Sequence, residues 1–240
     1  MLNDKVIFIS GGTGYIGEAI CRACAEYGAR VIFTYHSDSE RALRFQSELP
    51  GSLALYLNLA CVSELTQIIE TLHTEIKRID VLVNNAGITQ VMPFAMIEEE
   101  DFNYLMEINV KGTFFLTKAV ARGMIRHRSG VIINIGSIAG HRMYDVPVHY
   151  AISKAAIPGL TFSLAAELKR YGIRVNTVVP GLIEDGISRS IADDLREDFN
   201  AHCATGRPGT GREVAELVCF LASDRANYIN GQNIFIDGGI

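Results

Sequence analysis

The 240-residue sequence predicts an α/β fold: a single domain with a doubly wound parallel sheet of about seven strands and helices on both faces. Three observations predict it. Short runs of β-branched residues alternate along the chain with longer segments of helical periodicity. Most of the short runs are apolar on both faces, as strands are in a parallel sheet that helices cover on both sides. No linker, repeat or change of composition interrupts residues 1–240.

The predicted elements follow one another in a βαβ rhythm that requires right-handed crossovers. Strands are expected at residues 5–10, 30–35, 53–57, 80–84, 131–135, 174–179 and 233–237. Helices are expected near residues 15–27, 39–48, 63–76, 99–127, 149–171 and 213–222. The helix at 99–127 and the one that begins near 149 are about twice the usual length, and we expect them to carry a subunit contact. The charged stretch 184–206, before the last helix, is expected to form a substrate lid.

The composition excludes several classes of protein. Lys and Arg total 22 while Asp and Glu total 27, and the resulting net charge of −5 argues against a general nucleic-acid binder. An apolar content of 48% excludes a disordered chain. The longest uncharged stretch, residues 81–97, contains asparagine, glutamine and proline and is too polar to span a bilayer, so we expect no membrane partner.

Five scattered cysteines and the lack of a signal-peptide pattern predict reduced thiols in a cytoplasmic protein. Cys21 and Cys24 form a CxxC pair, but no second pair completes a zinc site, and Cys24 continues the apolar face of the first helix. The six histidines show no HxxxH spacing. We therefore expect no catalytic metal.

A glycine-rich turn follows the first strand and opens the first helix. Its glycines permit a tight turn, the approach of a pyrophosphate and close packing of helix on strand, which is typical of a Rossmann-type dinucleotide site. The helix N-terminus adds N–H groups for the phosphates. The turn supplies these candidate cofactor contacts: Gly11, Thr13, Gly14, Tyr15, Ile16 and Gly17.

The end of the second strand indicates which dinucleotide fits. Tyr35, His36 and Ser37 stand where an NAD-dependent enzyme usually has an Asp or Glu for the ribose 2′-hydroxyl. The first carboxylate is Asp38, and His36, Ser37 and Arg41 can contact a 2′-phosphate instead. NADP(H) is therefore favoured over NAD(H), and an ordinary polar turn is the alternative interpretation.

Tyr150 and Lys154 form the sharpest chemical feature, because residues four apart share one face of a helix. An ammonium about 4 Å from a phenol is worth about 4 kcal/mol at an effective dielectric of 20, which predicts a Tyr150 pKa about three units below its usual value. Ser137 stands at the carboxyl end of the fifth strand, and Asn84 ends the fourth. Ligands bind at this edge of an open α/β sheet, so we expect one crevice to hold all of these groups.

These residues resemble the short-chain dehydrogenase/reductase family, and within it the chain is most similar to bacterial 3-oxoacyl-(acyl-carrier-protein) reductases. The resemblance extends from Lys5 to Asp237. It includes the glycine-rich turn, Asn84-Asn85-Ala86-Gly87, Asn109, Ser137, Tyr150, Lys154, Pro180-Gly181 and Gly206-Arg207-Pro208-Gly209. The chain departs from the family pattern at Tyr15, where most short members have glycine, and at Asp185, where a threonine is common.

The resemblance implies a role for each catalytic candidate. Tyr150 would be the general acid that protonates the developing alkoxide, Ser137 would bind the carbonyl, and Lys154 would hold the nicotinamide ribose. Asn109 would order a water in a proton relay to Lys154. Beyond the turn, the implied cofactor contacts are Asn58, Leu59, Asn84, Ala86, Gly87, Tyr150, Lys154, Pro180, Gly181 and Ile183.

The resemblance also implies a reaction and partners. We expect NADPH-dependent reduction of a 3-oxoacyl thioester, carried by an acyl carrier protein, in fatty-acid or polyketide-like synthesis. Arg122, Arg126 and Arg128 would form the carrier-protein docking site, and the enzyme would be a homotetramer or a dimer. An alcohol, sugar or steroid dehydrogenase of the same family is one alternative, and a catalytically silent dinucleotide-binding regulator is another.

Overall fold

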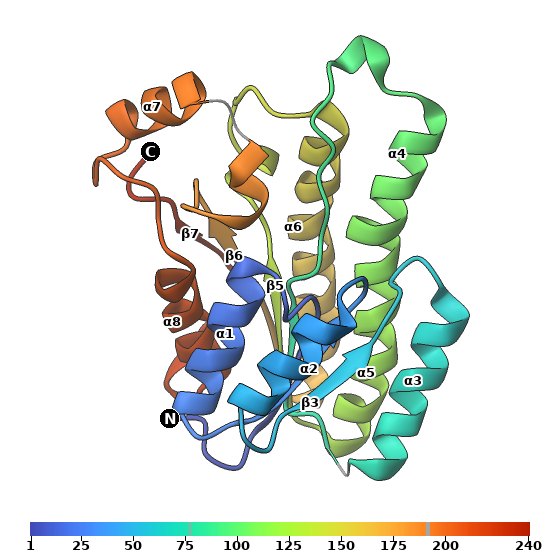
Figure 1. Cartoon of the computed structure of the whole chain (residues 1–240). Helices are drawn as coiled ribbons and strands as arrows, with labels where there is room; N and C mark the ends of the chain where they lie inside the picture. Colours follow the sequence, from blue (N-terminus) through green and yellow to red (C-terminus); the bar gives the residue numbers. More distant parts are fainter. Residues whose placement is uncertain (77, 191–192) are drawn as a thin grey trace.

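The computed structural model describes residues 1–76, 78–190 and 193–240, and these contain one seven-stranded parallel sheet (Figure 1). The sheet order is β3-β2-β1-β4-β5-β6-β7. The strands are β1 (Val6–Ile9), β2 (Arg30–Tyr35), β3 (Leu53–Tyr56), β4 (Val81–Asn84), β5 (Gly130–Ile135), β6 (Ile173–Pro180) and β7 (Asn233–Ile236). The predicted doubly wound fold is therefore confirmed. The chain changes direction between β1 and β4, which is where such sheets open a ligand crevice.

The helices match the predicted periodicity in most places. They are α1 (Tyr15–Glu26), α2 (Ser39–Glu48), α3 (Val62–Glu75), α4 (Glu99–Met106), α5 (Thr113–His127), α6 (Val148–Leu168), α7 (Asp193–His202) and α8 (Gly211–Ala222). The expected helix at 99–127 is divided by a π-helical segment, η2 (Glu107–Gly112). α7 lies inside the stretch that we expected to be a lid, and residues 191–192 of that stretch fall outside the described residues.

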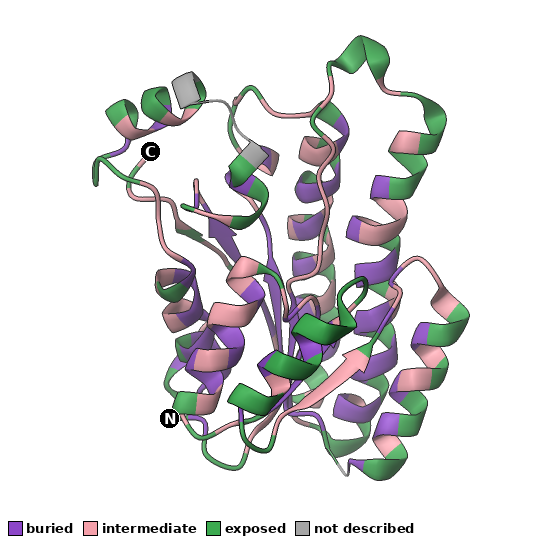
Figure 2. Ribbon diagram, in the orientation of Figure 1, coloured by how far each residue is buried: buried purple, intermediate pink, exposed green. Residues whose placement is uncertain are grey.

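Two layers of helices bury the sheet between them. Side chains alternate along each strand, so Ile7 and Ile9 face one layer and Phe8 faces the other. α1, α2 and α8 cover the first face, and α3, α5 and α6 cover the second. Figure 2 shows the buried strands between helices whose outer faces are exposed. None of the helices in the described residues has both the length and the apolar composition of a membrane span.

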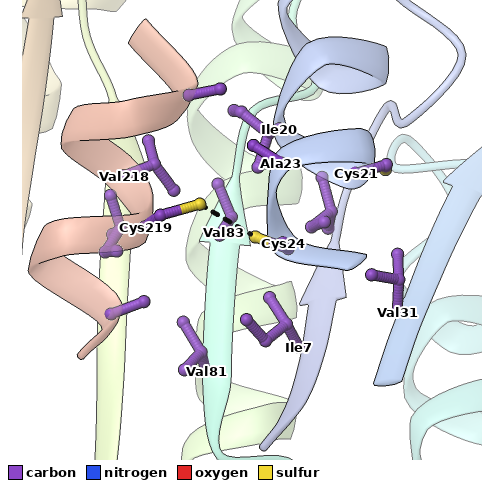
Figure 3. Packing of buried hydrophobic residues seen from close by; sticks show 14 of the residues in the cluster. Ile7, Ile20, Cys21, Ala23, Cys24, Val31, Val81, Val83, Val218 and Cys219 are labelled. Atoms are coloured by element: carbon purple, nitrogen blue, oxygen red, sulfur yellow. Dashed lines mark hydrogen bonds between the residues drawn. The ribbon is translucent and has the colours of Figure 1, made fainter. Parts of the chain in front are cut away.

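α1 and α8 pack tightly against each other, as Figure 3 shows. Cys24 of α1 and Cys219 of α8 are fully buried, and their sulfur atoms lie 3.6 Å apart. Cys21 is buried on the same helix, and burial raises the pKa of its thiol. The CxxC pair therefore belongs to the apolar face of α1.

The start of α1 lies unusually close to the end of β1. A Cβ atom on Gly17 would lie 2.1 Å from the carbonyl oxygen of Gly11, and one on Gly12 would lie 2.4 Å from Cβ of Phe33. No side chain fits at such separations. Gly11 also has a φ of +67°, which glycine adopts without strain. These glycines therefore fix where the first helix begins.

We predict that Gly17→Ala lowers stability although alanine favours helices. Helix propensity alone would add about 1 kcal/mol of stability, but the clash with Gly11 should reverse the sign and cost about 1–3 kcal/mol. Gly159→Ala in α6 is the matched control, because nothing lies within 4 Å of the added Cβ. Urea unfolding should show Gly159→Ala at or above wild-type stability; equal effects of the two variants would contradict the packing argument.

Candidate active site

A cavity of about 750 Å³ opens at the carboxyl ends of the central strands. Nearly all of the predicted site residues line it, although they come from distant parts of the sequence. Those in its wall are Gly11, Thr13, Gly14, Tyr15, Ile16, Gly17, Tyr35, His36, Ser37, Asn58, Leu59, Ala86, Gly87, Ser137, Tyr150, Lys154, Pro180, Gly181 and Ile183. Asn84 and Asn109 are absent from this wall in the described residues.

The glycine-rich turn forms one end of the cavity. Gly14 caps α1 without a side-chain hydrogen bond, so the first N–H groups of the helix face the cavity unpaired by a capping side chain. Asn85, which was not among the predicted cofactor contacts, donates through Nδ2 to the carbonyl oxygens of Ser10 and Gly11, each at 3.0 Å. The turn is thereby tied to the end of β4. This arrangement suits the phosphates of a dinucleotide.

The residues after β2 line the same end of the cavity. His36 stacks on Tyr56 with ring centroids 5.8 Å apart. Asp38 caps α2 by accepting from the backbone N–H of Arg41 at 2.8 Å, so its carboxylate is engaged. The Arg41 guanidinium pairs with Glu18 at 3.2 Å. The Arg41 guanidinium thus has an ionic partner already, and its contact with a 2′-phosphate stays a prediction.

Tyr150 and Ser137 both line the cavity, and the Ser137 hydroxyl lies near enough to the Tyr150 phenol to affect its pKa. Ser137 is held by its own contact, since its Oγ accepts from the backbone N–H of Ala139 at 3.2 Å. Burial raises the pKa of Tyr150, and the Ser137 hydroxyl offsets part of that rise. The phenol is therefore protonated at neutral pH, as a general acid must be.

Lys154 lies beside this pair, but its ammonium is directed elsewhere. Nζ donates to the carbonyl oxygen of Ile135 at 3.1 Å and lies 5.9 Å from the centre of the Tyr150 ring. Burial lowers the pKa of Lys154 to about 8. The predicted fall in the Tyr150 pKa is wrong for this structure, because desolvation outweighs the attraction of an ammonium at that distance.

Asn109 lies behind the cavity wall, within the π-helical segment. Its Oδ1 accepts from the N–H of Ile88 at 2.8 Å, and its Nδ2 donates to the carbonyl of Ile88 at 2.9 Å and to Ser153 at 3.0 Å. The fully buried Ser153 then donates to the carbonyl of Tyr150 at 2.8 Å. The side chain of Asn109 thus links the loop after β4 to the helix that carries Tyr150. Ser153 was not predicted as a site residue from the sequence. Its position three residues after Tyr150 was the available signal that it lies near the site.

The structure corrects the prediction that Asn84 contacts the cofactor. It is 4% exposed, and Nδ2 donates to Thr117 and to Asn134, both at 2.8 Å. Asn134 donates in turn to Thr161 at 2.7 Å. The cause is the alternation of side chains along a strand, which turns Asn84 into the core and Asn85 toward the cavity.

The other end of the cavity has largely apolar walls. Those walls come from Tyr104 and Ile108, from Ile138 and the loop after it, and from Leu195 and Phe199 of α7. Apart from Lys154, the charged side chains in the described wall are those of Asp145, Asp185 and Asp198. α7 lies in the stretch 184–206 that the sequence predicted as a substrate lid, but the helix itself was not predicted, although Leu195, Phe199 and Cys203 recur at helical spacing.

Comparison with known sequences agrees with this geometry. Residues 13–240 match the profile of a family described as Enoyl-(Acyl carrier protein) reductase. The chain is 37% identical over 239 residues to the 3-oxoacyl-(acyl-carrier-protein) reductase FabG of Vibrio cholerae, covering 100% of this chain and 98% of the relative. Its counterpart from Thermotoga maritima is 38% identical over 244 residues, with 100% and 98% covered.

Solved structures of similar chains have the same fold. A gluconate 5-dehydrogenase from Burkholderia cenocepacia, in complex with NADP and tartrate, superimposes with a TM-score of 0.93 at 31% identity, covering 99% of this chain and 95% of that one. A short-chain dehydrogenase/reductase mutant from Serratia marcescens gives a TM-score of 0.91 at 33% identity, with 99% and 98% covered.

We predict that Lys154 gives the protein a distinctive pH dependence of stability. Because its pKa is about 8 in the folded state and near 10.4 when unfolded, the unfolded chain binds the extra proton between those values. Wild-type stability should therefore rise relative to Lys154→Met from pH 8 to pH 10, by about 2 kcal/mol. Urea unfolding of both proteins across this range measures the difference. Parallel profiles would show that Lys154 is not desolvated.

Proposed function

The chain belongs to the short-chain dehydrogenase/reductase family, and from that premise we propose that it reduces a 3-oxoacyl thioester to the 3-hydroxyacyl form with NADPH. The observation that carries this proposal is that Tyr150 and Ser137 line one cavity, between a dinucleotide turn and an apolar pocket. The full-length likeness to 3-oxoacyl reductases supports the choice of substrate.

The catalytic residues divide the work of carbonyl reduction. The bound cofactor supplies the hydride that adds to the carbonyl carbon. Ser137 holds the carbonyl oxygen, and Tyr150, protonated because burial raises its pKa, donates the proton to that oxygen. We propose that Lys154 binds a ribose hydroxyl and returns a proton to Tyr150. Its pKa of about 8 suits both tasks near neutral pH.

The cavity also supports NADPH as the cofactor. The wall after β2 presents His36 and Ser37 and no carboxylate. Asp38 is turned to its own helix, whose N-terminus is positive and lies beside Ser37. The crystal structure of the gluconate 5-dehydrogenase relative contains NADP. A 2′-phosphate would therefore meet hydrogen-bond donors and no negatively charged side chain.

The walls of the substrate end favour a neutral, apolar substrate. The acidic side chains of Asp145, Asp185 and Asp198 would repel a sugar acid, and the described wall offers no arginine to pair with one. The reacting end of a 3-oxoacyl thioester is uncharged and is followed by an aliphatic chain. This contrast favours the thioester over a substrate like that of the gluconate dehydrogenase relative.

We propose that an acyl carrier protein docks at the end of α5. The guanidinium groups of Arg128 and Arg170 lie 5.8 and 5.0 Å from the same Tyr171 ring, which gathers positive charge on an acidic chain. Arg122, also in the predicted docking set, is paired with Glu70 at 3.6 Å. Arg126 belongs to the same set and lies in the last turn of α5. Opposite charge would steer an acidic carrier protein to this cluster.

We propose this docking site for an enzyme that forms a homotetramer or a dimer. α5 ends where β5 begins, so the cluster lies about 20 Å, the length of β5, from the cavity of the same chain. We propose that a carrier protein bound there serves the cavity of a second copy. Exposed apolar side chains on the long helices, among them Phe114 at 48% and Phe162 at 51%, support contact between copies.

We predict NADPH oxidation with a 3-oxoacyl thioester, on carrier protein or on a short pantetheine mimic, and slower oxidation with NADH. Tyr150→Phe should lower kcat by about 10²- to 10⁴-fold, because the proton donor is lost. Isothermal titration should show that Tyr150→Phe still binds NADPH. Absence of turnover in wild-type protein that binds NADPH would reject the proposed substrate class, and gluconate oxidation would select the alternative.

We predict that Arg128→Glu separates docking from chemistry. Reversing this charge should raise KM for the carrier-bound substrate about tenfold, while KM for the pantetheine mimic stays within twofold. Arg44→Glu, which changes an exposed charge on α2 by the same amount, is the control. Equal KM changes in both variants would mean that net charge, and not this cluster, governs carrier binding.

A further inference from the structure

Tyr15 joins three segments that are distant in the sequence. Its hydroxyl donates to the carboxylate of Glu184, in the loop after β6, and accepts from the backbone N–H of Gly211 at 3.5 Å, at the start of α8. Burial and the bond to Glu184 both raise the pKa of Tyr15, so the phenol stays a donor at neutral pH. The same ring lines the dinucleotide end of the cavity.

The loop that Tyr15 contacts forms part of the substrate wall. Residues 185–188 line the cavity, and η5 (Gly186–Ser190) runs through this loop. A Cβ atom on Gly186 would lie 3.1 Å from Cβ of Tyr15, so the loop lies directly against the tyrosine. Glu184 is also held at its backbone, where its N–H donates to the carbonyl of Gly209 at 2.9 Å.

Arg196 extends this connection to α7. Its guanidinium donates to the carbonyl of Ser188 at 2.8 Å and to that of Glu184 at 3.4 Å. α7 supplies Leu195 and Phe199 to the apolar wall. A continuous set of contacts therefore leads from the glycine-rich turn, through one phenol, to the surface that would hold an acyl chain.

We propose that Tyr15 is a positioning residue that couples dinucleotide binding to the order of the substrate wall. A dinucleotide over the turn packs beside the Tyr15 ring and restricts its side chain, and the restricted hydroxyl holds Glu184 and the loop behind it. By linkage, the dinucleotide and the acyl substrate should then strengthen each other's binding by the same factor. The choice of acyl substrate rests on the proposed function; the contact between turn and loop does not.

The experiment compares Tyr15→Phe, Glu184→Ala and the double variant. Tyr15→Phe removes one hydroxyl and keeps the ring, while Glu184→Ala removes the acceptor at a residue outside the cavity wall. Tyr27→Phe is the matched control, because its hydroxyl donates to Glu216 at 2.7 Å and joins the other end of α1 to α8. Hydrogen exchange of residues 184–190, with and without NADPH, and the KM of the acyl substrate are measured.

In wild-type protein NADPH should slow hydrogen exchange in residues 184–190. Both single variants should lose most of that protection and raise KM for the acyl substrate about fivefold, the effect of one exposed hydrogen bond to a charged group. The double variant should add little, since both changes remove one interaction. Tyr27→Phe should behave like wild type in both measurements.

Three results would overturn the proposal. The first is unchanged protection by NADPH in Tyr15→Phe. The second is that Tyr15→Phe weakens NADPH binding while Glu184→Ala changes neither KM nor hydrogen exchange. Tyr15 would then only contact the cofactor and would not position the loop. The third is additive effects in the double variant. Because the exchange measurement needs only NADPH binding, failure of the thioester as a substrate would reject the proposed function and leave this test intact.

Discussion

The approach of α1 to the end of β1 is the constraint on which the rest of the structure depends. A Cβ atom at Gly17 would collide with the Gly11 carbonyl and lie 2.8 Å from Nδ2 of Asn85. Because no side chain intervenes, the helix begins directly over the sheet edge, and its N–H groups open into the cavity. The same placement brings α1 against α8 and sets Tyr15 beside the loop after β6.

The sequence was informative where a periodicity determines geometry. Short β-branched runs predicted the strands, and the four-residue spacing of Tyr150 and Lys154 predicted that both line one cavity. The sequence did not predict the contacts that depend on the direction or the length of a side chain. Asn84 and Asn85 are neighbours of one type, yet one is core and the other faces the cavity. Lys154 has four rotatable bonds, so the sequence could not show that its ammonium binds the Ile135 carbonyl.

A buried polar network holds α6 against the sheet. Asn84, Asn134 and Thr161 are linked by side-chain hydrogen bonds, and Thr161 contacts Thr177 of β6 at 2.7 Å. Such bonds are strong in an apolar interior and costly when broken, so they favour one register of α6 on the strands. Tyr150 and Lys154 lie on the same helix. Polar residues that touch no ligand therefore set where the reacting groups lie.

The π-helical turn η2 acts as an extra residue inserted into a long helix. Deleting one residue there would restore regular α-helical pairing and change the position of α4 relative to α5. Tyr104, which forms part of the cavity wall from α4, would then point elsewhere, while α5 would keep its contacts with the sheet. The shape of the apolar end of the cavity is thus open to change by single-residue insertions and deletions at η2, a route for divergence that leaves Tyr150 untouched.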